Sequence, residues 1–303
     1  MRTLLILMIA ALTLVSCRSQ DLIRPGDSLE VAFDKAKSQY DQENWSEAAR
    51  SFETVISIGR GTDLGQEAQY LLAESYYNNR RYLLAASEYE RYANLYPRSE
   101  RRENVDFKIG MSYYNMSPRY KLDQTYTRQA VENFRLFNSR YADSERAEEA
   151  VEYIDELREK LARKQYSAAE FYMLTNRYLA ATVYHDIIID EYPETSWAEK
   201  ALVDQIYAYI LYADNSVQAR QKERYEEAIS SYDTYMQLFP RGENRSRAEE
   251  LYDRAQREID RIEEREARAS AQSGSWLWAG ELVYLADLLT QFTTATLLSL
   301  NRF

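Results

Sequence analysis

Cysteine and histidine each occur once in this chain of 303 residues, as Cys17 and His185. A thiolate can act as a nucleophile or a metal ligand, and an imidazole as a base or a metal ligand near neutral pH. One cysteine excludes an intramolecular disulfide and any cysteine-based metal cluster. Three carboxylates follow the histidine, Asp186, Asp190 and Glu191, and they are the candidate partners of a metal site or an acid–base pair.

Cys17 closes a short apolar segment at the start of the chain. Met1 and Arg2 form a basic start, and residues 4–15 are almost entirely apolar. A run of about a dozen apolar residues is too short to span a bilayer as a mature helix, but it suits a secretory signal. The sequence LVSC at residues 14–17 resembles the lipobox of bacterial lipoproteins.

The lipobox resemblance implies that residues 1–16 are a signal peptide and that Cys17 becomes the first residue, carrying palmitate-type acyl chains. The alternative is a buried structural cysteine beside an ordinary cleavage site. Residues 17–27 then form a tether. In the lipoprotein family an Asp directly after the cysteine retains the protein in the inner membrane, whereas Arg18 follows here. We therefore expect a lipid anchor in the outer membrane, on its periplasmic face.

The composition narrows the class of protein further. The formal net charge is −11, 29% of the residues are charged, and there are only 8 Gly and 5 Pro. An acidic surface disfavours nucleic acid or anionic lipid as the main partner. Few turn-forming residues in a long chain favour an all-α fold.

An internal repeat is marked by an alanine with an aromatic residue three positions before it and another four positions after it. The pattern recurs around Ala48, Ala85, Ala130, Ala181 and Ala228. Thr127 replaces the first aromatic in the third copy, and His185 replaces the last in the fourth. At helical spacing these side chains share one face, so two helices can approach closely at the alanine. His185 is therefore expected to be a packed side chain rather than a catalytic base.

A second mark shows where each repeat ends. An aromatic residue stands eleven positions after four of the alanines, at Tyr96, Tyr141, Tyr192 and Phe239, and proline follows three of them. Proline cannot continue a helix, because its ring clashes with the preceding turn and it has no N–H. The first copy ends instead in the glycine-rich sequence SIGRGTDLG. Capping boxes are predicted at Asn44 with Glu47 and at Ser196 with Glu199.

These repeats resemble tetratricopeptide repeats, with longer periods and the largest insertion expected around residues 115–127. The predicted fold is a right-handed α-solenoid of about five helical hairpins with a charged helix and an apolar tail helix after them. The predicted segments are an N-terminal half with repeats 1–3 (28–145), a C-terminal half with repeats 4–5 (146–242), a charged capping helix (243–270), and a linker with the apolar tail (271–303).

One family combines these features. Residues 156–202, with the helix entry KLARKQYSAAEFY, resemble the fourth-repeat region of the BamD family, lipoproteins of the outer-membrane β-barrel assembly (BAM) machine. Residues 104–116 and 122–144 resemble the family's third repeat, including the pair Asp123-Gln124. The resemblance runs from about Ala32 to Phe239.

The resemblance implies a non-enzymatic scaffold with no cofactor besides the lipid. Its C-terminal half would bind the barrel-insertase subunit, other BAM lipoproteins would be further partners, and its N-terminal half would receive unfolded outer-membrane β-barrel substrates. The alternative is another periplasmic tetratricopeptide lipoprotein that scaffolds cell-envelope or cell-wall enzymes. An enzyme is disfavoured, because the chain has no glycine-rich phosphate loop, zinc-binding histidine pair or nucleophile elbow.

Several side chains are candidates for binding partners. First-helix tyrosines suit recognition of an extended peptide, although packing between helices is the competing explanation; they are Tyr70, Tyr76, Tyr77, Tyr113 and Tyr114. In the C-terminal half, the BamD family resemblance places a partner-contacting Arg at the position of Tyr184, which cannot supply that charge. Arg177 is a possible substitute or a solvated turn residue.

The chain ends in an apolar segment, residues 276–303. Asp287 and scattered polar residues make it a poor membrane span, whereas Trp278, Leu282 and Phe292 share one helical face. We expect an amphipathic helix that docks on a partner or on the solenoid, or that lies in the membrane interface.

Overall fold

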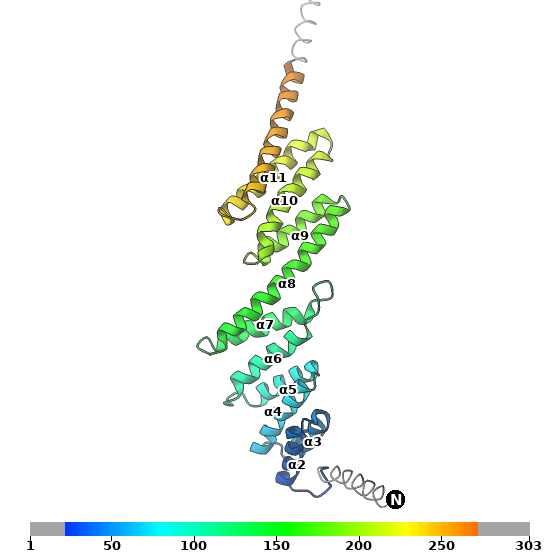
Figure 1. Cartoon of the computed structure of the whole chain (residues 1–303), viewed down its shortest axis with the longest axis vertical. Helices are drawn as coiled ribbons and strands as arrows, with labels where there is room; N and C mark the ends of the chain where they lie inside the picture. Colours follow the sequence, from blue (N-terminus) through cyan, green and yellow to red (C-terminus); the bar gives the residue numbers. More distant parts are fainter. Residues whose placement is uncertain (1–21, 272–303) are drawn as a thin grey trace, which may run out of the picture. The chain divides into compact units, whose positions relative to one another are not determined.

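The structure is a computed structural model that describes residues 22–271, and all regular secondary structure within this range is α-helical. The helices pair into five successive hairpins across these residues (Figure 1). The pairs are α2 (Leu29–Asp41) with α3 (Trp45–Ile58), α4 (Asp63–Asn78) with α5 (Tyr82–Leu95), α6 (Arg102–Met116) with α7 (Thr125–Arg140), α8 (Ala147–Leu174) with α9 (Tyr178–Glu191), and α10 (Ser196–Asp214) with α11 (Gln218–Leu238). The predicted all-α class is confirmed.

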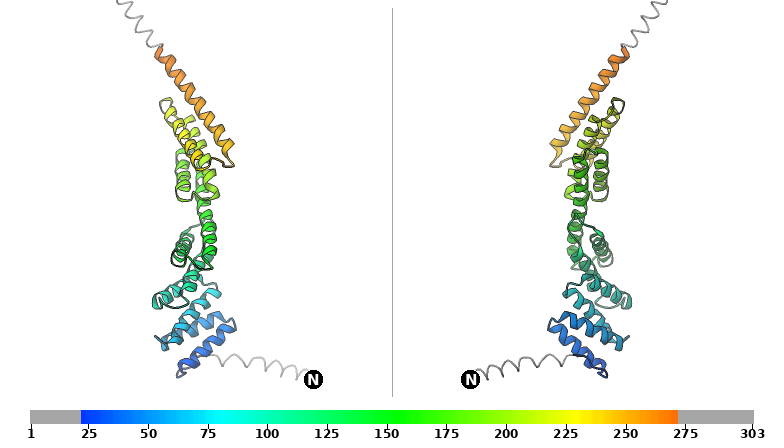
Figure 2. Two further views of the ribbon diagram at one scale, coloured as in Figure 1. Left: turned by 90° about the vertical axis from the view of Figure 1, so that its left-hand side faces the viewer. Right: turned by 90° about the vertical axis from the view of Figure 1, so that its right-hand side faces the viewer.

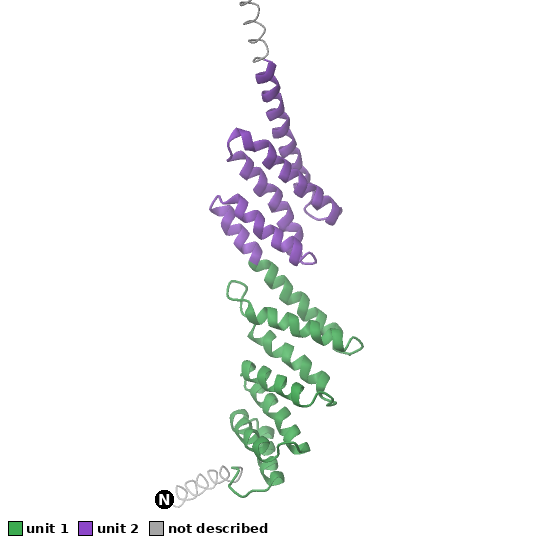
Figure 3. Ribbon diagram, turned by 180° about the vertical axis from the view of Figure 1, so that it is seen from behind, with its two compact units in different colours: residues 1–164 green, residues 165–303 purple. Residues whose placement is uncertain are grey.

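The chain divides into two compact units, residues 1–164 and 165–303 (Figure 3). The division falls inside α8, whereas the sequence placed the boundary between the halves at residues 145 and 146. Helix α8 is 28 residues long, so its first part packs in the first unit and its last part packs in the second. Lys160 bonds to Ser117 in the first unit, and Tyr166 bonds to Asp204 in the second.

The repeat alanines lie where the pattern predicts. All five are buried, and each belongs to the second helix of its hairpin. The aromatic residues eleven positions later are the C-cap residues of α5, α7, α9 and α11. In the first hairpin Gly59 takes this place as the C-cap of α3. The spacing therefore sets both the contact between two helices and the length of the second one.

The glycines after α3 permit a tight connection to α4. A Cβ atom added at Gly65 would lie 2.0 Å from the carbonyl oxygen of Gly59, so only glycine fits there. Gly61 has a φ of +83°, in the left-handed region that glycine adopts without strain. The hydroxyl of Thr62 accepts a hydrogen bond from the N–H of Gly65 and caps α4.

Both predicted capping boxes are wrong. Asn44 is the N-cap of α3 but makes no side-chain cap bond. Helix α10 begins at Ser196, so its N-cap is Thr195, and Glu199 instead accepts hydrogen bonds from the hydroxyl of Tyr235 and the N–H of Asn244. In α10, Glu199 bonds to Tyr235 and Asn244, which are distant in sequence, and is therefore not used to cap its own helix.

The helix 245–271 completes the second unit. Figure 2 shows this helix in orange beyond α11. Apolar side chains on one of its faces join the core formed by α10 and α11; they are Ala248, Leu251, Ala255, Ile259 and Ile262. The residues from 263 to 271 are exposed. This helix matches the predicted charged helix 243–270 within two residues.

None of the helices described between residues 22 and 271 is long and apolar enough to cross a membrane. The candidates Cys17, Trp278, Leu282 and Phe292 lie outside the described residues. Lipidation of Cys17 and docking of the tail therefore stay predictions.

Candidate protein-binding surfaces

His185 is a packed side chain of α9. It is 1% exposed, its ring lies 6.4 Å from the ring of Tyr166, and its Nδ1 atom has no hydrogen-bond partner among the described residues. Burial lowers the pKa of His185 to about 4, so the imidazole is neutral at pH 7. The neighbouring Asp186 accepts a hydrogen bond from Gln205 instead.

Within residues 22–271 no group of three histidine, cysteine or carboxylate side chains could hold a metal ion. The burial of His185 and its contact with Tyr166 show that it fills the aromatic position of its repeat, as the pattern predicts.

Two of the candidate tyrosines make equivalent contacts in successive repeats. The hydroxyl of Tyr76 on α4 donates to Glu53 on α3 at 2.7 Å, and that of Tyr113 on α6 donates to Glu90 on α5 at 3.0 Å. Burial, followed by the bonded carboxylate, raises the pKa of each tyrosine to about 12. Each bond joins the first helix of one hairpin to the second helix of the hairpin before it.

The other three tyrosines also link neighbouring helices. Tyr77 accepts a hydrogen bond from the amide of Asn115 at 3.2 Å, and Tyr70 accepts one from Asn104 at 2.9 Å. Tyr114 donates to Glu156 on α8 at 2.7 Å. All three rings are partly exposed. The five candidate tyrosines therefore form hydrogen bonds between neighbouring hairpins, and their rings are also partly exposed. Their role in binding stays a prediction.

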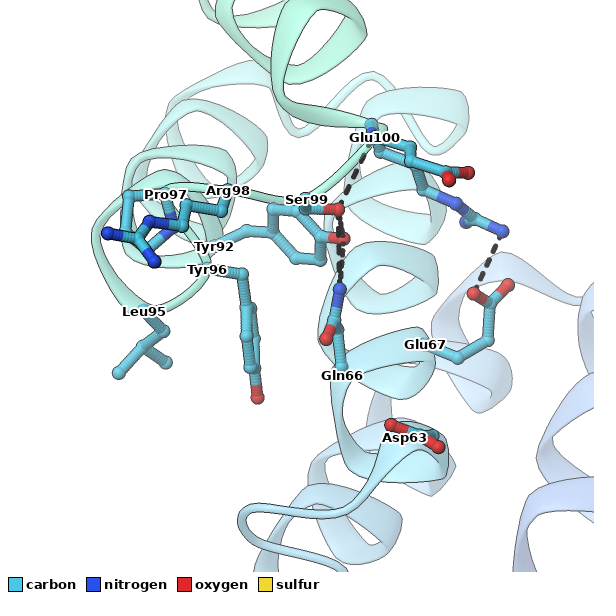
Figure 4. Close-up of a pocket in the computed structure, with 11 residues that line it drawn as sticks. Asp63, Gln66, Glu67, Tyr92, Leu95, Tyr96, Pro97, Arg98, Ser99 and Glu100 are labelled. Atoms are coloured by element: carbon cyan, nitrogen blue, oxygen red, sulfur yellow. Dashed lines mark hydrogen bonds and ion pairs between the residues drawn. The ribbon is translucent and has the colours of Figure 1, made fainter.

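A pocket of about 660 Å³ lies between the start of α4 and the turn that joins α5 to α6 (Figure 4). Leu95, Tyr96 and Pro97 supply its apolar wall. The side-chain amide of Gln66 donates to the hydroxyl of Tyr92 at 3.0 Å and to Ser99 at 3.3 Å, which fixes the base of the pocket. This pocket cannot be predicted from the sequence alone, although its Tyr-Pro helix end is one of the marks of the repeat.

The charged rim of this pocket connects it to a candidate tyrosine. The guanidinium of Arg101 lies 2.8 Å from Glu67 and 4.3 Å from the ring of Tyr70. Arg98 also lines the pocket and is absent from the salt bridges among the described residues. The carboxylates of Asp63, Glu67 and Glu100 line the pocket as well, so its rim carries both signs of charge beside an apolar wall.

The turn between α8 and α9 exposes apolar side chains. We name Phe171, Leu174, Leu179 and Val183 the α8–α9 apolar surface; each is about half exposed or more, and Leu174 is 83% exposed. Phe171 and Leu174 are three residues apart on α8, and Leu179 and Val183 are four apart on α9, so each pair shares a helix face. Exposed apolar residues gathered in one place commonly mark a protein interface.

The two candidates of the C-terminal half lie beside this surface. The ring of Tyr184 stacks on that of Tyr172 at a centroid distance of 5.3 Å, with 21° between the ring planes. Arg177 is the exposed N-cap residue of α9. Asn176, just before it, has a φ of +58°, which turns the chain from α8 into α9. Arg177 is thus a turn residue at the edge of the apolar surface.

The comparison with protein families decides what kind of chain this is. The family model YfiO, described as "Outer membrane lipoprotein", matches residues 26–224, which is more than half of the chain. The chain belongs to the BamD (YfiO) family. The match covers hairpins one to four and part of the fifth. The matched range therefore contains the residues of the pocket near Tyr70 and of the α8–α9 apolar surface.

Curated BamD relatives from several bacteria match this BamD-family chain. "Outer membrane protein assembly factor BamD" of Caulobacter vibrioides is 24% identical over 182 residues, which is 60% of each chain. The protein of the same name from Vibrio cholerae is 24% identical over 67% of this chain and 88% of its own. That of Neisseria meningitidis serogroup B is 23% identical over 69% and 84%.

Solved tetratricopeptide structures resemble this BamD-family chain only loosely. The "TPR2AB-domain:pHSP90-complex of yeast Sti1" has a TM-score of 0.34 and 14% identity, covering 75% of this chain and 98% of that one. The P58(IPK) TPR domain has a TM-score of 0.38 and 14% identity, covering 77% and 66%. The helices described above, and not these superpositions, establish the fold.

Proposed function

We propose that this protein is a lipid-anchored scaffold subunit of an outer-membrane β-barrel assembly machine and performs no catalysis. The family match over residues 26–224 is the observation that supports this most, because the matched relatives are named outer membrane protein assembly factors. Stacked helical hairpins suit a scaffold, since each presents side chains at fixed positions along a surface. Acylation of Cys17 would hold this acidic protein at the periplasmic face of the outer membrane.

The α8–α9 apolar surface is our candidate for the site that binds the barrel-insertase subunit. Leu174 and Val183 are large, apolar and exposed, and the Tyr172–Tyr184 stack gives the surface a rigid aromatic edge. Interfaces draw most of their binding energy from apolar and aromatic anchors that become buried. With Tyr184 in place of arginine, this contact relies on apolar burial rather than on an ion pair.

The pocket beside Tyr70 is our candidate for receiving unfolded β-barrel substrates. The strands of a β-barrel alternate apolar and polar side chains, and a last strand at the chain's C-terminus also carries the terminal carboxylate. Tyr96 and Pro97 offer an apolar wall to the apolar side chains, and Arg98 offers a cation to the carboxylate. Other lipoproteins of the machine are further expected partners, and no nucleic acid is expected.

Affinity purification of the full-length chain from its own outer membrane tests this function. We expect the barrel insertase to copurify with the wild type and to fall by about tenfold or more with Leu174→Glu/Val183→Glu, because two charges would be buried at the interface. The matched control is Ile58→Glu/Leu83→Glu, two similarly exposed apolar residues on α3 and α5, which should retain the insertase. Recovery of cell-wall enzymes without an insertase would contradict the proposal.

A further inference from the structure

The loop between α6 and α7, residues 117–124, is fastened to the middle of α8. The ammonium group of Lys160 donates to the hydroxyl of Ser117 at 3.0 Å, and that of Lys164 donates to the carbonyl oxygen of Leu122 at 2.6 Å. Lys160 and Lys164 are four residues apart and therefore share a helix face. The loop and this face of α8 form one surface within the first unit.

The loop is also held from inside. The amide of the buried Gln124 donates to the carbonyl oxygens of Arg119 and Leu122, both at 3.0 Å. The hydroxyl of Thr127 donates to Gln124 in return, at 2.7 Å. The side chains of Arg119, Lys121 and Leu122 are consequently exposed on a backbone that is fixed at several points.

Positive charge gathers on this surface. We name the α6–α7 basic cluster by its six residues, Arg119, Lys121, Arg128, Lys160, Arg163 and Lys164. The guanidinium of Arg163 lies 4.3 Å from the centre of the Tyr120 ring, and the ammonium group of Lys121 lies 5.7 Å from it. Asp123 is the carboxylate of the loop, and it accepts a hydrogen bond from the N–H of Thr125 at 2.9 Å.

Asp123 offsets part of this charge, because Arg128 and Lys164 both act on its carboxylate electrostatically, but salt bridges balance little of the rest. Five of the six cations form no salt bridge with any residue between 22 and 271; they are Arg119, Lys121, Arg128, Lys160 and Lys164. Like charges held within about 8 Å of one another repel at physiological salt, so such a cluster has a cost in stability. Neutral donors could fasten the loop equally well. The chain as a whole has a net charge of −11, so the cations gathered on this surface favour binding of an acidic ligand.

We propose that the α6–α7 basic cluster binds an acidic segment of a partner protein. The ammonium groups of Lys160 and Lys164 lie behind the loop and are only partly exposed, so a carboxylate side chain reaches them more easily than a flat bilayer does. Leu122, which is 59% exposed, supplies an apolar contact beside them. The proposal goes beyond the proposed function and does not depend on it, because it concerns neither the α8–α9 apolar surface nor the pocket near Tyr70.

Fluorescence anisotropy with the full-length chain tests this site. The probe is a fluorescein-labelled peptide of about ten residues in which Glu alternates with Ala, and the control peptide carries Gln in place of Glu. We expect the Glu peptide to bind about tenfold more tightly than the Gln peptide, and its binding to weaken as salt rises from about 50 to 300 mM. Arg119→Glu/Lys121→Glu should weaken binding about tenfold and spares the lysines that fasten the loop.

The matched control is Arg60→Glu/Arg80→Glu, which makes the same change in net charge at two exposed arginines elsewhere in the first unit. It should leave binding of the Glu peptide within about twofold, since screening limits the effect of distant charges. Equal loss in the two variants, or equal binding of the two peptides, overturns the proposal. So does binding to phosphatidylglycerol vesicles that is lost in Arg119→Glu/Lys121→Glu when the Glu peptide does not bind, because the occupant is then a membrane.

Discussion

The hydroxyl of Tyr89 donates a hydrogen bond to the carboxylate of Glu74 at 2.5 Å, and both side chains are buried in the first unit. Lys108 lies 3.6 Å from the same carboxylate and 4.1 Å from the ring of Tyr77. A buried carboxylate that keeps such partners can be tolerated, whereas loss of one partner leaves a poorly solvated charge. This contact ties α4 to α5 and makes the second hairpin sensitive to small changes.

Tyr89→Phe should destabilise the protein by about 1–3 kcal/mol, because it removes the donor to a buried carboxylate. Tyr113→Phe is the matched control, since it removes the same group from a bond to the exposed Glu90 and should cost less than about 1 kcal/mol. Urea denaturation followed by circular dichroism measures both. Equal losses would show that burial of Glu74 is not the cause.

Gly65→Ala should destabilise the first unit by about 2 kcal/mol or more, because the new Cβ atom would clash with the backbone of Gly59. Gly61→Ala is the comparison, since no atom lies within 4 Å of a Cβ there and the cost is backbone strain of about 1–2 kcal/mol. Thermal unfolding of the two variants beside the wild type ranks them. A milder effect at Gly65 than at Gly61 would contradict the close approach of α3 and α4.

His185 gives the second unit a dependence on pH. Burial lowers its pKa from 6.5 to about 4, so the unfolded chain takes up the proton first as the pH falls. The free energy of unfolding therefore has the full contribution of the neutral His185 above pH 6.5. This contribution declines towards pH 4, and about 2 kcal/mol of it is lost at pH 5.

His185→Phe restores the aromatic residue found at this position in other repeats and should remove that decline. The measurement is the difference in urea stability between pH 7.5 and pH 5 for the wild type and the variant. Burial raises the pKa values of Asp186 and Asp204 in both proteins, so their contributions cancel in the comparison. An identical pH dependence in the two proteins would show that the imidazole is not the group responsible.

The repeat pattern predicted the helical hairpins because it depends on contacts that are local in sequence. An alanine such as Ala85 and an aromatic such as Tyr96 fix a close contact and a helix end within one hairpin, so their spacing predicts both. The burial of His185 followed from the same register. Helix caps were less predictable, because Glu199 is used by Tyr235, which lies 36 residues away in the sequence.

The surfaces were harder to predict than the hairpins. The pocket near Tyr70 combines the start of α4 with the turn after α5, and the α6–α7 basic cluster combines a loop with residues about 40 positions later. Pairings at such separations leave no periodic signal in one sequence. The candidate tyrosines were predicted because their rings on first helices suit an extended peptide, with packing as the alternative. Their hydroxyl groups all bond to neighbouring helices, which the residue type alone does not reveal.

Depletion of this protein in the living cell tests the central claim most directly. With the gene under a controllable promoter, the readout is the amount of folded β-barrel protein in the outer membrane, distinguished from unfolded chains by its resistance to heat in detergent electrophoresis. The account predicts that folded barrels decline as the protein is depleted, that unfolded barrel chains accumulate, and that the wild-type gene restores assembly while Leu174→Glu/Val183→Glu restores much less. An undiminished amount of folded barrels after complete depletion would contradict a role in their assembly.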